Sequence, residues 1–363
     1  DLVRSRGLGD VYKRQGILFV GTGVSGGEEG ARRGPSIMPG GDKEGFSKIE
    51  GFLEKIAAKD FQGNPCVTYV GPGGSGHFVK MVHNSIEYGE MQAIAEVYSL
   101  MRNYLQLDPI KIASIFEKWM DSDLSSYLLE ITIDILRKYE NGEPLIDKIL
   151  DQAAQKGTGG WSLNTALEYG VPYGVLGEAV MARNLSARKG LRMISSGLYD
   201  LGRFPGIEDV DNFLDKLQAA YQATRIINHE VGFSLMLEVS EKNNWALNFS
   251  EIARIWTNGC IIRSKLMEEL VEIFKESNHI LLNYEAIIAL KSYQGDLSYV
   301  VGQALQNGFA VPVLSNAINY LLGVTTANSP ANLIQAQRDY FGAHTYRRND
   351  KDADQAFHTN WKE

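Results

Sequence analysis

Cysteine is nearly absent from this chain of 363 residues. Cys66 and Cys260 are the only two, so they provide neither a disulfide framework nor a Cys-x-x-Cys metal knuckle. This usage is typical of a reducing compartment, and we expect a cytoplasmic protein. No uninterrupted apolar run approaches the roughly 18 residues of a membrane span, so none is expected. The six histidines lack spacings such as His-Glu-x-x-His, and we expect no metal site.

An excess of positive charge is also missing. Lysine and arginine total 36 against 44 aspartates and glutamates, which gives a net charge of −8. This balance argues against a large surface for nucleic acid or anionic lipid, but it leaves room for a local cationic pocket that binds a small anion. The length and the 44% apolar content are ordinary for a globular protein of about two domains.

The pattern of residues changes near Gly76. Residues 16–76 are rich in glycine and contain two β-like runs, Ile17–Val20 and Cys66–Val70, with a helical stretch over 42–59 between them, which indicates an α/β segment. Residues 1–15 show no clear period and no signal-peptide core, and we interpret them as a cloning or assembly scar. Amphipathic patterns beyond Gly76 predict a large all-helical domain, with helices near 77–102, 108–138, 174–196, 208–241, 248–276, 284–307 and 329–341.

Two details refine this helical prediction. Leu107-Asp108 and the apolar residues after it resemble Leu247-Asn248 and its successors at a constant offset of 140 residues, which hints at a duplicated helical unit. In the last helix, Ser329 is expected as N-cap with Pro330 at the first helical position, and Gly342 as the stop.

Two glycine motifs fit G-x-G-x-x-G, namely Gly21–Gly26 and Gly71–Gly76. A dinucleotide loop must open a helix that leads to a second strand and an acidic residue for the ribose. Neither motif has that context, because prolines follow the first and only helices follow the second. A tight turn with unusual φ, or a loop whose N–H groups face another anion such as a carboxylate, remains open for each motif.

The helix that begins near His77 carries the most informative pattern. Lys80, His83, Asn84, Glu87 and Tyr88 stand at i, i+3, i+4, i+7 and i+8, so they share one helix face between apolar flanks. The stripe suits the wall of a polar pocket, but an ordinary exposed face has the same spacing, and the helix pattern alone leaves both interpretations open.

These residues resemble a known family. Residues 73–84 are similar to the lysine helix of the β-hydroxyacid dehydrogenases. Further motifs resemble the decarboxylating 6-phosphogluconate dehydrogenases in particular, at residues 24–32, 34–41, 156–159, 177–183, 338–344 and 358–361. The resemblance implies oxidation and decarboxylation of 6-phosphogluconate to ribulose 5-phosphate with NADP as cofactor, a step of the pentose phosphate pathway.

The resemblance also implies catalytic roles. Lys80 would be the base that removes the proton from the C3 hydroxyl, and Glu87 the acid that protonates C1 of the enediol. A free lysine has a pKa of about 10.4, so this base should be lowered toward roughly 7–8 by burial or by neighbouring cations.

The remaining implied roles concern binding. Ser25, Gly26 and Gly27, with His83 and Asn84, would hold the carboxylate and hydroxyls of the substrate. The phosphate would be bound by Tyr88, Lys156, Arg183 and Arg338. His344 would also bind the substrate, and a homodimer is implied because Arg338 and His344 would come from the partner subunit.

The implied organisation has four parts. Residues 1–15 are the scar, 16–76 the remnant of an NADP-binding Rossmann domain, 77–327 the helical catalytic and dimerisation domain, and 328–363 a C-terminal helix and tail that reach the partner. The main NADP loop is missing, so the cofactor-binding residues are unknown and we expect the fragment to be inactive without that half. Two alternatives stay open: a non-catalytic helical dimerisation fragment, or a related dehydrogenase with another anionic substrate. Gly160 departs from the basic residue expected there.

Overall fold

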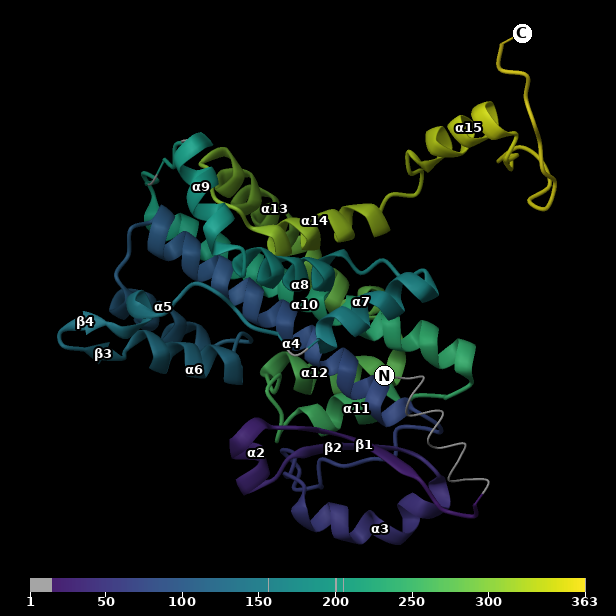
Figure 1. Cartoon of the computed structure of the whole chain (residues 1–363), viewed down its shortest axis with the longest axis horizontal. Coiled ribbons are helices and arrows are strands. Elements are labelled where there is room, and N and C mark those ends of the chain that lie inside the picture. The colour runs from purple at the N-terminus through teal and green to yellow at the C-terminus, as the bar shows by residue number, and fades with distance from the viewer. Residues whose placement is uncertain (1–14, 156, 200, 205, 363) are drawn as a thin grey trace. The chain divides into compact units, whose positions relative to one another are not determined.

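The computed structural model describes residues 15–155, 157–199, 201–204 and 206–362. This part of the chain forms two compact units, one ending at Ile318 and the other beginning at Asn319. An α/β segment comes first, and the rest of the described chain is mostly helical (Figure 1), which confirms the predicted fold class. No described helix is long and apolar enough to cross a membrane.

The expected scar lies almost entirely outside the described residues, and the predicted domain boundaries stay predictions. In chain order the elements are β1 (Val20–Ser25), α2 (Gly27–Arg33), β2 (Ser36–Gly41), α3 (Lys43–Ile56), α4 (Ser75–Ser99), a π-turn η1 (Leu100–Tyr104), α5 (Pro109–Met120), α6 (Tyr127–Leu136), β3 (Tyr139–Glu140), β4 (Glu143–Pro144), η2 (Leu145–Lys148), α7 (Thr158–Tyr169), α8 (Gly174–Ser186), α9 (Lys189–Tyr199), α10 (Val210–Asn243), α11 (Phe249–Trp256), α12 (Lys265–Glu276), η3 (Ile280–Leu282), α13 (Tyr284–Gln306), α14 (Pro312–Val324) and α15 (Ala331–Gly342).

The α/β segment is a small sheet between helices. β1 and β2 pair antiparallel, with Val20 opposite Gly41 and Ser25 opposite Ser36. Helix α3 packs its apolar side on this sheet, while α4 and α11 contact it as well (Figure 1). Gly76 makes the approach of α4 possible, because a Cβ there would lie 2.3 Å from the carbonyl oxygen of Gly21. The start of α4 is therefore fixed directly against the sheet.

Both predicted strands are displaced. The first was expected at Ile17–Val20, but β1 begins at Val20 and contains most of the first glycine motif, so that motif is mainly a strand rather than a turn. Cys66–Val70 forms no full strand; it runs beside β2, with one parallel bridge between Ile37 and Val67. Glycine lowers strand propensity, which explains why local pattern placed the strand too early.

The duplicated helical unit has a structural counterpart. Asp108 caps α5 and Asn248 caps α11, each accepting a hydrogen bond from the backbone N–H three residues on. Each of these helices is followed by a second one capped by serine, Ser126 for α6 and Ser264 for α12. The two serines form an antiparallel bridge, so the two helix pairs meet at equivalent points. The offset in sequence thus corresponds to a repeated, mutually paired element.

Several helix predictions need correction. The stretches 108–138, 174–196 and 248–276 each contain two helices, with breaks after Met120, Ser186 and Trp256. The first two breaks carry no glycine or proline, whereas the third contains Asn258-Gly259, a turn signal that the amphipathic pattern outweighed. In the C-terminal unit, Pro330 rather than Ser329 occupies the N-cap position, and α15 begins at Ala331. The expected end at Gly342 is confirmed, with Ala343 in the left-handed region as C-cap.

A buried ion pair joins the two longest helices. Arg225 of α10 is 1% exposed, and its Nε donates to Glu90 of α4 over 2.9 Å. Asn228 donates to the same carboxylate over 3.1 Å and to the carbonyl oxygen of Ile86 over 3.0 Å. These bonds hold α4 against α10 one turn from Glu87.

We expect Arg225→Met to lower the free energy of unfolding by about 3–5 kcal/mol, because it leaves the buried Glu90 carboxylate without its ionic partner. Urea unfolding followed by circular dichroism measures this change. Arg137→Met is the matched control, since Arg137 forms an exposed pair with Glu117. Equal losses in the two variants would contradict the importance of the buried pair.

Candidate active site

The polar stripe of α4 lines a hollow rather than an exposed face. Lys80, Asn84, Glu87 and Tyr88 border one cavity of about 420 Å³, and the turn after β1 borders its other side. His83 lies behind them and is completely buried. The pocket-wall interpretation of the i, i+3, i+4, i+7, i+8 spacing therefore describes this helix. Val24, Ser25, Gly26, Gly27, Met91, Ala154, Gln155, Thr158, Arg183 and Ile261 complete the lining.

The amine of Lys80 sits in a hydrogen-bonded chain. Its Nζ lies 3.1 Å from Nδ1 of His83 and donates to Oδ1 of Asn84. Nε2 of His83 in turn lies 3.1 Å from Oγ of Ser25. When Lys80 is an ammonium it can only donate, so Nδ1 of His83 must accept and Nε2–H must donate to Ser25. The protonation of Lys80 and the tautomer of His83 are thereby linked.

Burial lowers the pKa of Lys80, while the nearby carboxylate of Glu87 partly offsets this. Burial also lowers the pKa of His83 well below its usual value, and the charge of Lys80 acts in the same direction. Both burial and neighbouring cations were expected as causes of the lowered pKa of Lys80. Burial is the leading one here, and the charged neighbour Glu87 acts against it.

Glu87 has the opposite electrostatics. Burial raises the pKa of its carboxyl, and the positive charges of Lys80 and Arg183 lower it only in part. Its side chain is 16% exposed, so the carboxyl still reaches the cavity. One hollow therefore holds a lysine shifted toward the neutral amine and a glutamate shifted toward the neutral acid.

The turn after β1 depends on two glycines with positive φ. Gly26 has φ of 128° and Gly27 has φ of 60°. A Cβ at Gly26 would also meet the carbonyl oxygen of Gly259 at 2.6 Å. The same loop of the helical domain accepts a hydrogen bond from the N–H of Ser36 over 2.8 Å. These contacts hold Ser25 against His83.

Arg183 faces the cavity from α8. Its guanidinium carbon lies 3.4 Å from the centre of the Tyr88 ring, which is a close cation–π contact. Nη1 donates to the carbonyl oxygen of Ala154 over 3.3 Å. Nη2 donates to Sδ of Met91 over 3.4 Å, so the guanidinium is held at the wall of the cavity.

Three sequence-predicted residues are not brought to this hollow by the described structure. Lys156 lies outside the described residues. Arg338 and His344 belong to the C-terminal unit, where Arg338 donates to Gln335 over 3.1 Å and His344 packs edge-on against the ring of Phe341. Their proposed role at the substrate therefore rests on resemblance.

Other lining residues were missed. Thr158, which accepts from Asn84 over 3.4 Å, stands within a quoted motif but received no role. Ile261 and Met91 had no signal at all, because an isolated apolar side chain in a loop or at the end of a polar stripe looks like ordinary packing. Ile261 reaches the site only through the tertiary contact of its loop with the turn after β1.

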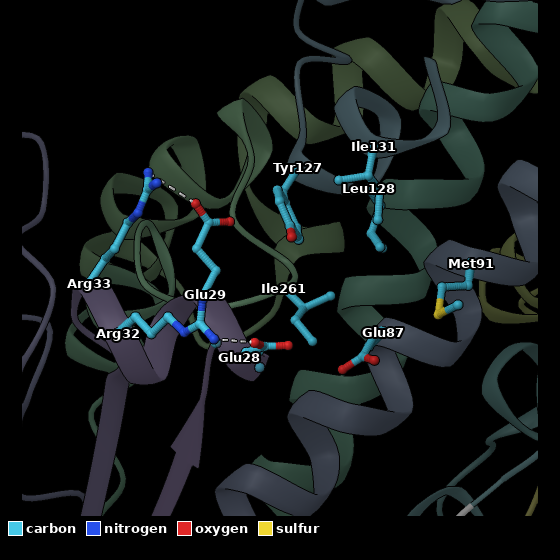
Figure 2. Close-up of a pocket in the computed structure, with 12 residues that line it drawn as sticks. Glu28, Glu29, Arg32, Arg33, Glu87, Met91, Tyr127, Leu128, Ile131 and Ile261 are labelled. Carbon is cyan, nitrogen blue, oxygen red and sulfur yellow. Dashed lines mark ion pairs between the residues drawn. The ribbon is translucent and has the colours of Figure 1, made fainter. Parts of the chain in front are cut away.

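Two further hollows adjoin the first. One of about 520 Å³ shares Gly26, Gly27, Glu87, Met91 and Ile261 with it; Figure 2 shows Glu87 and Met91 on one side and the ion-paired side chains of α2 on the other. The second, of about 320 Å³, shares only part of the wall. Its lining is Thr22, Gly23, Val24, His77, Lys80, Met81, Asn84, Thr158 and Trp161.

Comparison with known proteins agrees with this architecture. The family profile described as "6-phosphogluconate dehydrogenase, C-terminal domain" matches residues 76–361, and "NAD binding domain of 6-phosphogluconate dehydrogenase" matches residues 3–71. A 6-phosphogluconate dehydrogenase, decarboxylating, from Shigella flexneri is 47% identical over 352 residues, which cover 96% of this chain and 75% of that protein. An NADP(+)-dependent, decarboxylating relative from Bacillus subtilis (strain 168) is 46% identical over 95% of this chain and 74% of its own length.

A solved structure gives the same result. Plasmodium falciparum 6-phosphogluconate dehydrogenase, described in apo form and in complex with its cofactor NADP+ and its substrate 6-phosphogluconate, superposes with a TM-score of 0.96 at 40% identity over 99% of this chain and 78% of that one. The fold is thus that of a dehydrogenase with a nucleotide-binding domain and a helical domain. Within that class the chain belongs to the decarboxylating 6-phosphogluconate dehydrogenase family, which confirms the resemblance.

Glu87→Gln should change how stability depends on pH. The pKa of Glu87 is raised on folding. Its contribution to the free energy of unfolding is therefore fully present below the unfolded pKa of about 4.3, and it is lost as the pH rises through the folded pKa. The variant lacks this loss, so its free energy of unfolding should improve relative to the parent as the pH rises above about 4.3. Glu28→Gln, which removes an exposed carboxylate, should keep the parent's trend. Identical pH profiles for parent and Glu87→Gln would contradict the assignment.

Proposed function

We propose that this chain carries the active site for oxidative decarboxylation of 6-phosphogluconate to ribulose 5-phosphate and CO2. The observation that carries the proposal is the pair of oppositely shifted groups in one hollow, Lys80 toward the neutral amine and Glu87 toward the neutral acid. Two groups whose environments push their pKa values apart are the usual arrangement for a base and an acid.

Lys80 acts as the first base. Its neutral amine takes the proton of the C3 hydroxyl as the C3–H bond breaks, which leaves a β-keto acid and a lysine ammonium. When the C1–C2 bond then breaks and CO2 leaves, the electron pair moves onto the oxygen at C3. The ammonium donates to that oxygen and stabilises the developing charge. His83 and Asn84 keep the amine in place throughout.

Glu87 completes the reaction. The enediol left by the loss of CO2 must gain a proton on the carbon that becomes C1 of ribulose 5-phosphate. Burial raises the pKa of this carboxyl, which favours the protonated form that can donate a proton. Lys80 and Glu87 lie two turns apart on the same helix face, so they reach the substrate from one wall.

The two ends of the substrate meet different groups. Ser25, Gly26 and Gly27 hold the carboxylate and hydroxyls together with His83 and Asn84, as the contact between Ser25 and His83 supports. Arg183 binds the phosphate, because its planar guanidinium can donate two parallel hydrogen bonds to phosphate oxygens. The ring of Tyr88 packs against this guanidinium. Lys156 adds a second cation by family resemblance.

The smaller hollow beyond Lys80 fits the nicotinamide end of the cofactor. Its 320 Å³ are lined in part by Met81 and Trp161, which would hold the nicotinamide, and it shares Lys80 and Asn84 with the substrate cavity. NADP, when bound, accepts the hydride from C3. The name of the Bacillus subtilis relative favours NADP over NAD.

A second copy of the chain completes the assembly. Helix α9 has no buried residue, and Leu191, Met193, Ile194 and Leu198 are each more than half exposed. An apolar face of this kind marks an interaction surface, and we propose a cytoplasmic homodimer. In that homodimer Arg338 and His344 reach the neighbouring subunit's substrate.

In the chain extended to the full length of its Shigella flexneri relative, Lys80→Met should reduce kcat by roughly 10²–10⁴-fold, because it removes the general base while keeping an unbranched side chain. The assay follows NADPH, CO2 and ribulose 5-phosphate from 6-phosphogluconate. Lys275→Met changes an exposed lysine of α12 and should leave the rate unchanged. Equal rates for parent and Lys80→Met would refute the assignment of the base.

Arg183→Ala should weaken binding of 6-phosphogluconate by about 10–100-fold, since a charged hydrogen bond contributes roughly 1.5–3 kcal/mol. Calorimetry with gluconate, which lacks the phosphate, provides the matched ligand, and its affinity should not change. Arg137→Ala is the matched protein control because that arginine is exposed and pairs with Glu117. Equal losses for both ligands would argue against a phosphate contact and favour a dehydrogenase for another anion.

A further inference from the structure

One carboxylate organises the C-terminal unit. Asp339 lies in the last turn of α15 and is completely buried, although the residues around it are mostly exposed. Buried aspartates are rare unless their oxygens are paired. The partners of this side chain therefore define what holds the segment together.

Four donors meet the two oxygens of Asp339. Oδ1 accepts from the N–H of Thr345 over 3.0 Å and from Nδ1 of His358 over 2.9 Å. Oδ2 accepts from the N–H of Thr359 over 3.1 Å and from Nε1 of Trp361 over 2.8 Å. The donors come from the turn after α15 and from the end of the chain, so one side chain ties both segments to the helix.

The turn beside this carboxylate is strained. Ala343 has φ of 50° and Thr345 has φ of 58°, in a region that non-glycine residues seldom adopt, least of all a β-branched one. Such residues persist only where their surroundings hold them. The antiparallel bridge between Tyr346 and Phe357 holds the residue that follows this turn. His344 stands between the two strained residues.

We propose that Asp339 is a positioning residue for substrate binding: its carboxylate holds the strained turn at 343–345 and so fixes how Arg338 and His344 are presented. This inference rests on the proposed function, which brings those two side chains to the substrate of the neighbouring subunit. Arg338 precedes Asp339 directly, so a rotation of the last turn of α15 would redirect its guanidinium.

The ionised state of the Asp339 carboxylate strengthens its four hydrogen bonds. Burial alone would raise the pKa of Asp339, but the hydrogen bonds from His358, Trp361 and Thr359 lower it to about 2. The group is thus ionised throughout the neutral range, and all four donors keep a charged acceptor. Hydrogen bonds to an ionised acceptor are about twice as strong as neutral ones.

The first experiment tests whether the hydrogen bonds to Asp339 hold the turn and the end of the chain. Asp339→Asn keeps the shape but replaces one acceptor oxygen by an N–H₂ group that faces two donors. In the full chain, hydrogen exchange at the amides of Thr345 and Thr359 should become at least tenfold faster. Asp354→Asn removes a 96%-exposed carboxylate of the same segment and should change neither amide. Unchanged exchange in Asp339→Asn would overturn the proposal.

The second experiment tests positioning. Calorimetry should show about tenfold weaker binding of 6-phosphogluconate to Asp339→Asn and no change for gluconate. The loss should not add to that of Arg338→Ala in the double variant, because both act through one guanidinium. In the chain extended to the full length of its Shigella flexneri relative, the KM for 6-phosphogluconate should rise, with kcat largely kept.

The outcomes distinguish a failure of the positioning role of Asp339 from a failure of the proposed function on which it rests. Faster exchange with unchanged affinity, while Arg338→Ala weakens binding, overturns the positioning role alone. An unchanged affinity in Arg338→Ala overturns the assignment of the tail to the phosphate and the inference with it. Should Asp339→Asn fail to fold, Trp361→Phe removes one donor and keeps an aromatic ring, and it should show smaller changes of the same kinds; no change in either measurement would again count against the proposal.

Discussion

The arrangement of the site depends on the burial of one amine. Lys80 is largely buried where α4 meets the sheet, and its amine forms hydrogen bonds with His83 and Asn84 that leave room for a third partner. In water this amine would stay charged near neutral pH, and desolvation is what lowers its pKa. Desolvation in turn requires that the turn after β1 lie directly on α4, which places Ser25 against His83. The contact between the turn after β1 and α4 therefore sets both the lowered pKa of Lys80 and the packing of the sheet on this helix.

The contact between the turn after β1 and α4 is supported by the packing of α4 on the long helix α10. Glu90, Arg225 and Asn228 form a buried network one turn from Glu87, and Asn228 also binds the carbonyl oxygen of Ile86. A buried polar network of this kind fixes one register between two helices, because any slip would leave charges without partners. The acid and base of the proposed reaction thus share a helix whose position is fixed at both ends, by the sheet at Gly76 and by α10 farther along.

Much of this could be read from local pattern, and the remainder could not for identifiable reasons. The face that holds Lys80 and Glu87 follows from helical spacing alone, and the helical domain follows from amphipathic periods. The position of β1 did not follow, because its glycines are selected by the close approach of α4 and hide the strand signal. Ile261 was invisible because only a loop contact between distant segments brings it to the cavity. The hydrogen-bonding role of Asp339 could not be predicted from the sequence either, since its four donors are spread over residues 345–361.

The charge balance of the cavity shows why order in the C-terminal unit matters for the proposed function. A phosphate monoester carries about −1.5 to −2 charges at neutral pH. Among the described lining residues the fixed cation is Arg183, because Lys80 must be neutral to act as a base. In the proposed function, Lys156 and Arg338 add further positive charge. A cation on a loose segment would lose conformational freedom on binding, which opposes affinity. Under the proposed role of Asp339 this loss is smaller for Arg338, so part of the affinity for the substrate is established before the substrate arrives.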